Sequence, residues 1–524
     1  MARHRIGNAG LAEHTRAEPE HTVARRVSGA AAWSYVGVFA DRAIRFVVFM
    51  VVARLVSPAQ FGTVMLCLLT VEALQAVLDV GLATALIQQP SVSQPELDTA
   101  FLITMGVSAL TAAALFVGAP GLTALVHEPA AAPLLRALAF TPLINGAGAV
   151  HLALIQRDMG FKALAGRTVG ASLIASAAAV ALAVAGLGAW ALVVRTLTLA
   201  VFGTLAAWWV SPFRPRLRFD PASVRGVAPA GLRLWASGVA TQVNGRGFDF
   251  LAGIVLGAVA LGALRIAGQT VLLLIELTVG PMTAVGYSLL SRSRDQPEAF
   301  QSTLVTVATF AAMLIFPTFA GLFVVADPLL PLMFGDRWAP AAAITPYMCA
   351  IAPALYWQLL VSVALFASGR TDRMLQWALI EAAVTVVLGL AGARFGLVGL
   401  ALAGVLRLYL MTPLGWRWLR RDTGVDPRLL LRPALPSAMA AIVMAMVVGL
   451  AKSRLAPSLS APALSAALIG IGVVTYALLL PLWAGRLLKP LLEGHGWLDR
   501  LAARGLLKTP LQHVRSRWSG GTPP

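Results

Sequence analysis

The amino-acid sequence predicts an all-α integral membrane protein with about 14 transmembrane helices, and two observations lead to this prediction. Of the 524 residues, 58% are hydrophobic and only 12% are charged, with a mean hydropathy of +0.79. Soluble globular domains carry about 25% charged residues. Apolar runs of about 20 residues, the length that a helix needs to cross the hydrocarbon core, also recur along the chain. The runs are too long for the strands of an outer-membrane barrel and lack their alternation, so the bundle is expected to be helical.

Short polar gaps separate the apolar runs and set the expected boundaries of each span. We expect spans at residues 31–56, 62–87, 99–119, 134–155, 168–186, 189–210, 234–256, 265–288, 302–325, 341–367, 374–393, 397–416, 434–451 and 462–484.

The chain resembles itself weakly at a shift of about 200 residues. This shift brings Arg45 within one position of Arg246, and Glu72 has a rough counterpart in Glu276. Transporters are often built from two related bundles with the substrate site between them. We therefore expect two lobes of six spans each, followed by two additional C-terminal spans.

The expected organisation follows from this repeat and from the polar segments at the two ends. It comprises an N-terminal tail (1–30), an N-lobe (31–211), a basic linker (212–230), a C-lobe (231–419), spans 13 and 14 (420–485) and a basic C-terminal tail (486–524).

The net charge of +18 is explained by membrane topology. Lys and Arg are concentrated in both tails and in the gaps at residues 156–167, 212–233, 291–301, 368–373 and 417–433. The alternate gaps at residues 57–61, 120–133, 187–188 and 257–264 carry none. The exception is the gap at residues 88–98, which lies on the expected basic side and also carries none. Basic loops remain in the cytoplasm, so both termini are expected there, in a multi-pass protein of the bacterial inner membrane. The basic residues are scattered over short loops, which argues against nucleic acid and leaves anionic lipids and substrates as partners.

Residue types that carry most enzymatic chemistry are sparse. Cys67 and Cys349 each lie inside an expected span, and the seven histidines show no ligand spacing, so neither a metal nor another cofactor is expected. The longest expected periplasmic gap, residues 326–341, is too short for a domain that would hold a sugar acceptor. We therefore expect a protein that is not an enzyme, with a membrane polysaccharide polymerase or glycosyltransferase as the less favoured alternative.

The first span carries charges near its middle. At about 100° per residue, Asp41, Arg42 and Arg45 share one helix face, whereas Arg54 lies almost opposite, near the membrane edge. We interpret Arg54 as an anchor whose side chain reaches the interface. An arginine at mid-bilayer costs about 2.5 to 3.5 kcal/mol even on insertion scales, so the other arginines are expected to face a partner or a wet cavity.

The seventh span repeats this pattern. Gln242, Arg246 and Asp249 lie within an arc of about 100°, and Arg246 is about as deep in its span as Arg45 is in the first. Arginines at equal depth in two lobes predict one shared cavity. The alternative stays open that Asp41 with Arg45, and Arg246 with Asp249, are neutralised pairs that only fix packing.

Three segments carry a resemblance to a known family: VARLVSPAQFGTVML, DVGLATALIQQPSVSQPELDTAF and LIQRDMGFKALAGR. They resemble the landmarks of the bacterial oligosaccharide flippases, which belong to the multidrug/oligosaccharidyl-lipid/polysaccharide exporter superfamily. The resemblance covers mostly residues 30–170, and the fourteen-span layout extends it over the chain.

This resemblance implies a fold similar to the multidrug and toxin extruders, with two six-helix lobes around a central cavity. It implies that the chain moves undecaprenyl-diphosphate-linked repeat units to the periplasmic leaflet by alternating access, for O-antigen, capsule or exopolysaccharide assembly. A polysaccharide polymerase or export machinery is a possible partner, and a monomer is expected. A cation-coupled multidrug exporter of the same superfamily is the alternative, which would be expected to have an acid-rich cavity.

A diphosphate suits guanidinium groups, because their forked donors match phosphate oxygens and keep their charge at any working pH. The candidate substrate-binding residues are Arg42, Arg45, Arg246 and Arg265. The carboxylates Asp41, Asp249, Glu72, Glu276 and Glu381 are candidates for charge pairing or for coupling to an ion. Arg195 and Arg407 are the possible partners on other spans.

Overall fold

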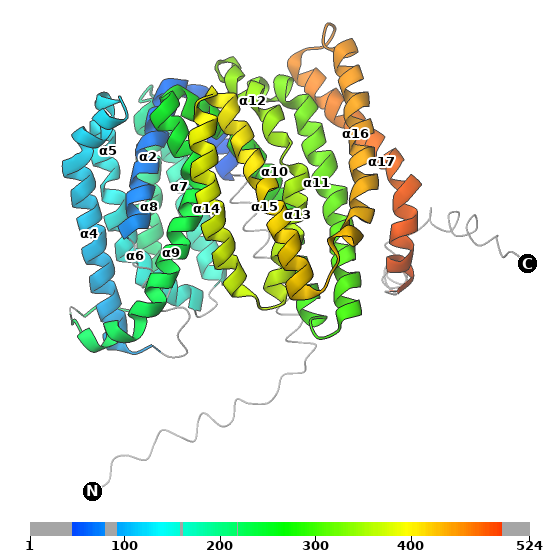
Figure 1. Ribbon diagram of the computed structural model, residues 1–524. Coiled ribbons are helices and arrows are strands. Elements are labelled where there is room, and N and C mark those ends of the chain that lie inside the picture. Colours follow the sequence, from blue (N-terminus) through cyan, green and yellow to red (C-terminus); the bar gives the residue numbers. More distant parts are fainter. Residues whose placement is uncertain (1–43, 79–91, 158–160, 217, 495–524) are drawn as a thin grey trace, which may run out of the picture. The chain divides into compact units, whose positions relative to one another are not determined.

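The computed structural model describes residues 44–78, 92–157, 161–216 and 218–494. Its regular secondary structure in these ranges is helical, with no strand. The packing of the backbone divides the chain into two compact units, residues 1–263 and residues 264–524. Figure 1 shows the helices of both units, labelled along the chain.

The first unit contains ten described helical elements. They are a helix over residues 44–55, α2 (Pro58–Leu78), α4 (Gln94–Leu125), the 3-10 turn η1 (Pro129–Ala131), α5 (Ala132–Leu138), α6 (Phe140–Arg157), α7 (Phe161–Val184), α8 (Ala189–Val210), α9 (Pro221–Leu251) and the π-helix η2 (Ala252–Leu256).

Outward-facing surfaces of these helices are strongly apolar. Val117, Leu125 and Trp209 expose more than 70% of their surface. Water would penalise apolar surface of this extent, whereas the hydrocarbon of a bilayer accommodates it. The described helices are therefore those of a multi-pass membrane protein.

The connection between α8 and α9 has no regular secondary structure in its described residues and is fixed to the start of α4. Asp98, which is buried, accepts hydrogen bonds from Gln94 Nε2 and from the backbone N–H of Arg216, each 2.9 Å long. Thr99 Oγ1 accepts a hydrogen bond from the backbone N–H of Asp220 at 2.9 Å. The second part of the linker expected at residues 212–230 is helical, because α9 begins at Pro221.

The first turns of α2 pack closely against the backbone that follows η2. At the end of η2, Gly257 has a φ of 86°, which allows the chain to turn into α10 (Ala258–Arg292). A Cβ atom on Gly62 of α2 would overlap the backbone carbonyl of Ala258. Only glycine therefore fits at position 62 with this packing.

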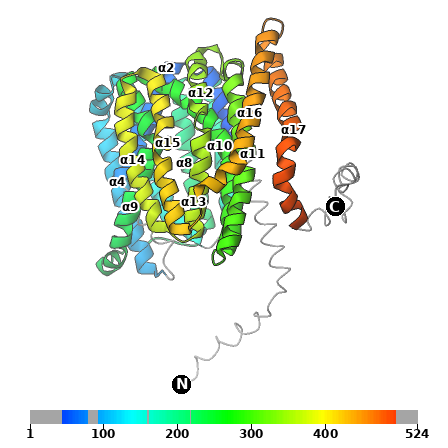
Figure 2. The same cartoon turned by 45° about the vertical axis from the view of Figure 1, so that its right-hand side comes forward.

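The second unit continues from α10. Its further elements are α11 (Pro297–Phe334), η3 (Asp336–Trp338), α12 (Ala339–Cys349), α13 (Ala352–Ala367), α14 (Thr371–Ala393), α15 (Gly396–Thr423), α16 (Pro427–Leu455) and α17 (Ala461–Gly494). Figures 1 and 2 show α16 and α17 side by side, and both pack on α11.

Each of the fourteen expected spans coincides, in its described part, with a helix or with consecutive helices. By length and composition, ten of the described helices could cross a membrane, and eleven if the pair formed by η3–α12 and α13, bent by 56°, counts as one span. The helix over 44–55, α7 and α9 do not meet this measure. The multi-pass architecture is confirmed, and the count of fourteen stays a prediction.

The compact units divide the chain later than the expected lobes. The C-lobe is predicted to begin at residue 231, which lies inside α9, whereas the units divide between Ala263 and Leu264. The reason is that α9 packs on α2 and α4, both of the first unit. The two-lobe organisation stays a prediction.

Candidate functional site

Four side chains form a polar group between α2 and α9 in the first unit, here named the α2–α9 cluster: Glu72, Gln242, Arg246 and Asp249. Arg246 Nε lies 3.0 Å from Glu72 Oε2, and Arg246 Nη1 lies 3.9 Å from Asp249 Oδ2. Gln242 Nε2 donates to the same Glu72 oxygen at 3.4 Å. Two carboxylates thus share one guanidinium, and Glu72 holds it more closely.

Helix geometry explains how α9 contributes three of these residues. Gln242, Arg246 and Asp249 are spaced four and three positions apart, which places them on one face. Farther along the same helix pair, Trp235 Nε1 donates to the backbone carbonyl of Val77 at 2.9 Å. This bond and the cluster join α9 to α2 at two levels.

The cluster is partly open. The side chains of Arg246 and Glu72 each expose 37% of their surface, and that of Asp249 exposes 15%. Of the guanidinium nitrogens, Nη2 has no contact among the described residues, whereas Nε and Nη1 face the carboxylates. A guanidinium that is held by acids and still accessible can exchange one anionic partner for another.

The structure thus brings together three of the predicted site residues: Arg246, Asp249 and Glu72. The spacing on α9 predicts the pair of Arg246 with Asp249, whereas Glu72 lies in the other expected lobe, with Arg195 or Arg407 as its expected partner. The sequence separation of 174 residues hides the pair. The spacing on α9 fixes a helix face, but it does not show which helix that face meets.

Other predicted site residues lie elsewhere. Arg45 has an exposed side chain on the helix over 44–55. Arg265 and Glu276 are both half-buried on α10 in the second unit. Asp41 and Arg42 fall outside the described residues.

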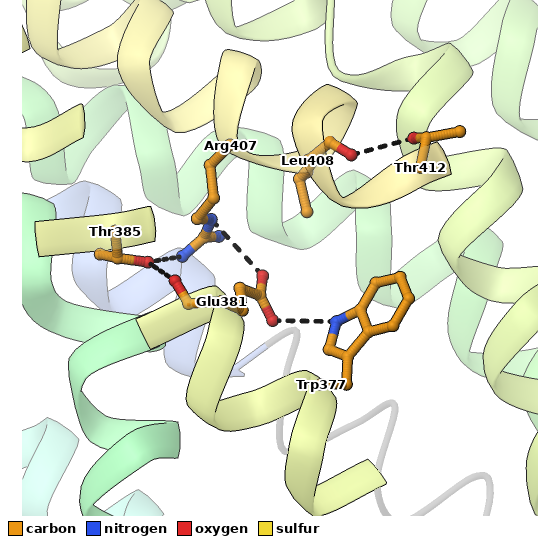
Figure 3. A network of polar contacts seen from close by, with 6 residues as sticks. All are labelled: Trp377, Glu381, Thr385, Arg407, Leu408 and Thr412. Atoms are coloured by element: carbon orange, nitrogen blue, oxygen red, sulfur yellow. Dashed lines mark hydrogen bonds and ion pairs between the residues drawn. The ribbon is translucent and has the colours of Figure 1, made fainter. Parts of the chain in front are cut away.

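A second polar network, shown in Figure 3, lies between α14 and α15 and involves Glu381. Arg407 Nε lies 3.5 Å from Glu381 Oε1, and Trp377 Nε1 donates to Glu381 Oε2 at 3.2 Å. Thr385 Oγ1 accepts from Arg407 Nη1 at 3.2 Å and donates to the backbone carbonyl of Glu381 at 2.7 Å. Arg407 is one of the two partners expected for Glu381, and the structure pairs them.

Trp377 and Thr385 were missed as members of this network, although their spacing contains a signal. Positions 377, 381 and 385 are four apart, so the three side chains share one face of α14. Glu381 is only 7% exposed, and its carboxylate has partners on both oxygens. This arrangement neutralises a buried charge and joins α14 to α15.

Metal-ligating residues do not gather in the part of the chain that the structure describes: no group of three or more His, Cys, Asp or Glu is placed to hold an ion. Cys67 and Cys349 are both buried, free thiols.

Comparison with known proteins identifies relatives over most of the chain. The chain is 25% identical over 434 residues to the succinoglycan biosynthesis transport protein ExoT of Rhizobium meliloti (strain 1021), covering 82% of this chain and 86% of that protein. The fold resembles the lipid II flippase MurJ in an inward closed conformation, with a TM-score of 0.69, 14% identity and coverage of 87% of this chain and 99% of that one.

An inward-facing multidrug resistance MATE family transporter of the MOP superfamily also matches the fold. Its TM-score is 0.57 at 15% identity, with coverage of 73% of this chain and 94% of that chain. At such identities the likeness concerns the fold alone, and it confirms the expected similarity in fold to the extruders.

A family model described as "Polysaccharide biosynthesis protein" matches residues 51–343, more than half of the chain. The match contains α2 with Glu72 and α9 with Arg246. The chain therefore belongs to this family of polysaccharide biosynthesis proteins.

Proposed function

We propose that the chain is a flippase that moves undecaprenyl-diphosphate-linked oligosaccharide repeat units from the cytoplasmic to the periplasmic leaflet by alternating access, for surface polysaccharide assembly. Family membership supports this proposal, as does the similarity to ExoT, a transport protein of succinoglycan biosynthesis. The structural observation that supports it most directly is that the guanidinium of Arg246 is paired with Glu72 on α2 and is still partly exposed.

In this mechanism the diphosphate replaces Glu72 on Arg246. The guanidinium offers a forked set of donors that matches two phosphate oxygens, and its exposed fraction lets the headgroup reach it. Glu72 then re-forms the ion pair when the substrate leaves. The acid therefore keeps Arg246 neutralised between transport cycles and competes with the substrate for it.

Further arginines complete the anionic site in this proposal. Arg42, Arg45 and Arg265 supply additional positive charge for the headgroup, since one guanidinium does not balance a diphosphate. Asp41, Asp249, Glu276 and Glu381 act in charge pairs or in ion coupling, and the Glu381–Arg407 pair favours a structural role for Glu381.

We place the chain in the bacterial inner membrane with both termini in the cytoplasm, where basic loops stay. It acts as a transport protein without catalysing sugar transfer, and as a monomer beside the polymerase and export machinery of its polysaccharide. Anionic lipids are its other partners.

The two carboxylates of the α2–α9 cluster favour a second candidate, a cation-coupled multidrug exporter. Glu72 and Asp249 outnumber the single arginine there, and an acidic site attracts cations. The two candidates differ in substrate charge, so removing Arg246 would harm only the flippase.

The deciding experiment deletes the protein in its host and locates the lipid-linked repeat units. We expect complete, unpolymerised repeats to accumulate facing the cytoplasm, with surface polysaccharide restored by the wild-type chain. Normal polysaccharide together with altered drug sensitivity would overturn the flippase in favour of the exporter. Sugar transfer by the purified protein would favour the enzyme.

A further inference from the structure

A cavity of about 470 Å³ lies inside the first unit. Residues of α4, α6, α7 and α8 line it, together with Gln75 of α2. A water molecule occupies about 30 Å³ in the liquid, and small-molecule sites span about 300 to 1,000 Å³. The cavity therefore has the size of a ligand site.

The lining of this cavity is uncharged, with hydroxyl and amide groups set among apolar surface. Of its twenty described lining residues, nine carry a hydroxyl or amide side chain and none carries a charged one. The nine are Gln75, Thr104, Ser108, Thr111, Thr141, Asn145, Thr168, Thr196 and Thr204. Such a surface suits a neutral ligand with many hydroxyl groups, because an ion would lack a counter-charge there.

One hydroxyl in the cavity has no protein partner in the described residues. Thr141 is 8% exposed, and its Oγ1 is buried without a hydrogen bond. One helical turn later on α6, Asn145 lines the same cavity and is exposed. A buried polar group left unpaired costs free energy, which a hydroxyl of a ligand would recover.

Two glycines of α6 make room for the hydroxyls of neighbouring helices. A Cβ atom on Gly146 would overlap the side chain of Ser108 on α4, and one on Gly148 would lie 3.0 Å from Thr204 Oγ1 on α8. The close approach of three helices therefore brings hydroxyl side chains to the cavity wall.

The cavity adjoins the α2–α9 cluster through α2. Gln75 lines the cavity, and Glu72, which holds Arg246, lies three positions earlier on the same helix. Side chains at this spacing are neighbours, about 5 to 6 Å apart at Cβ. In a lipid diphosphate sugar, the first sugar is bonded directly to the diphosphate. We propose that this cavity binds the sugar residue attached to the diphosphate while the diphosphate lies at Arg246, an inference that rests on the proposed function.

The test compares two probes on the full-length protein in detergent: undecaprenyl diphosphate, and the undecaprenyl-diphosphate-linked repeat unit extracted from the host. Wild-type protein should bind the sugar-bearing lipid more tightly than the bare one. Thr141→Val combined with Asn145→Leu should lower affinity for the sugar-bearing lipid by roughly tenfold, as expected for two lost hydrogen bonds, and leave the affinity for bare lipid unchanged.

Thr123→Val is the matched control, because Thr123 is also a buried threonine of this unit and does not line the cavity. Thr141 Oγ1 has no hydrogen bond to lose in the described residues, so Thr141→Val alone should keep or raise the melting temperature and still weaken binding of the sugar-bearing lipid. Equal affinities of wild-type protein for the two probes would overturn the inference and leave the flippase standing. Unchanged affinities in the cavity variants would do the same. Binding of neither probe would remove the flippase and this inference together.

Discussion

Arg246 lies closer to one of its two acidic partners than to the other. The guanidinium lies 3.0 Å from Glu72 and 3.9 Å from Asp249, so in the proposed mechanism Glu72 is the partner that the diphosphate displaces. Truncating Arg246 to alanine would also remove the stem that packs α9 against α2. Glutamine keeps most of that stem and removes only the charge.

Arg246→Gln should weaken binding of undecaprenyl diphosphate by about 10-fold to 100-fold, the range for a lost charge-assisted hydrogen bond. Glu72→Gln should tighten it, because a neutral amide competes less with the diphosphate for the guanidinium. Calorimetric titration of the purified protein in detergent measures both. Arg373→Gln is the matched control, since Arg373 also lies 3.0 Å from its acid, Asp422. If all three variants bind undecaprenyl diphosphate as tightly as the wild type, Arg246 does not bind the substrate and its ion pairs only stabilise the packing of α9 on α2.

The Glu381–Arg407 pair is a buried network, and its energetics differ from those of the cluster. Arg407→Met leaves the Glu381 carboxylate buried without its guanidinium, which should cost about 3 to 5 kcal/mol of stability. The double variant Glu381→Leu with Arg407→Met should recover most of this loss, because no unpaired charge remains. Thermal unfolding in detergent, followed for both variants, measures the difference. A double variant as unstable as the single one would contradict the pairing.

These two sites show what the sequence specifies at the residue scale. Arginines inside apolar spans are costly, so their presence alone predicts partners, and the spacing on α9 places Arg246 beside Asp249. The partner across helices is determined by packing of whole elements. Glu72 was therefore missed as the main partner of Arg246, whereas Arg407 could be named for Glu381 only as one of two candidates.

At the scale of elements, the apolar runs predict where helices lie, because about 20 residues must cross the hydrocarbon. They do not predict the interruptions. The π-helix Ala252–Leu256 and the 56° bend between α12 and α13 both fall inside segments that are expected as single continuous spans. Such breaks depend on contacts between helices, such as the one that Gly62 makes with Ala258.

Gly62→Ala should destabilise the first unit by about 1 to 3 kcal/mol, because its Cβ would overlap a backbone carbonyl that cannot rotate away. Gly106→Ala is the control. Gly106 lies inside α4 with open space around its Cβ position, so alanine there should be neutral or slightly stabilising. Melting temperatures of the two variants in detergent provide the comparison. A Gly62→Ala protein that melts like Gly106→Ala would show that α2 does not lie against this turn.

At the scale of the whole molecule, the alternation of basic and neutral loops predicts orientation, which the packing of helices does not determine. The segments between α15 and α16 and between α16 and α17 test it with few changes. The ends of α15 and α16 that flank the first segment are rich in arginine, and this side is expected in the cytoplasm. The second, around Ser458, is expected in the periplasm.

Ser458→Cys should react with a membrane-impermeant maleimide in intact spheroplasts, whereas Arg421→Cys should react only after the membrane is opened. Both side chains are exposed, so accessibility depends on the side of the membrane on which each lies. Both variants are made in a background in which Cys67 and Cys349 are replaced with alanine, so that only the introduced thiol can react. In the unmodified protein these two native thiols are buried, so they should react slowly. The opposite labelling pattern would show that the protein has the inverse orientation in the membrane. In the proposed mechanism the diphosphate would then enter from the periplasmic side. Labelling of both positions in intact spheroplasts would instead mean that α16 does not cross the membrane.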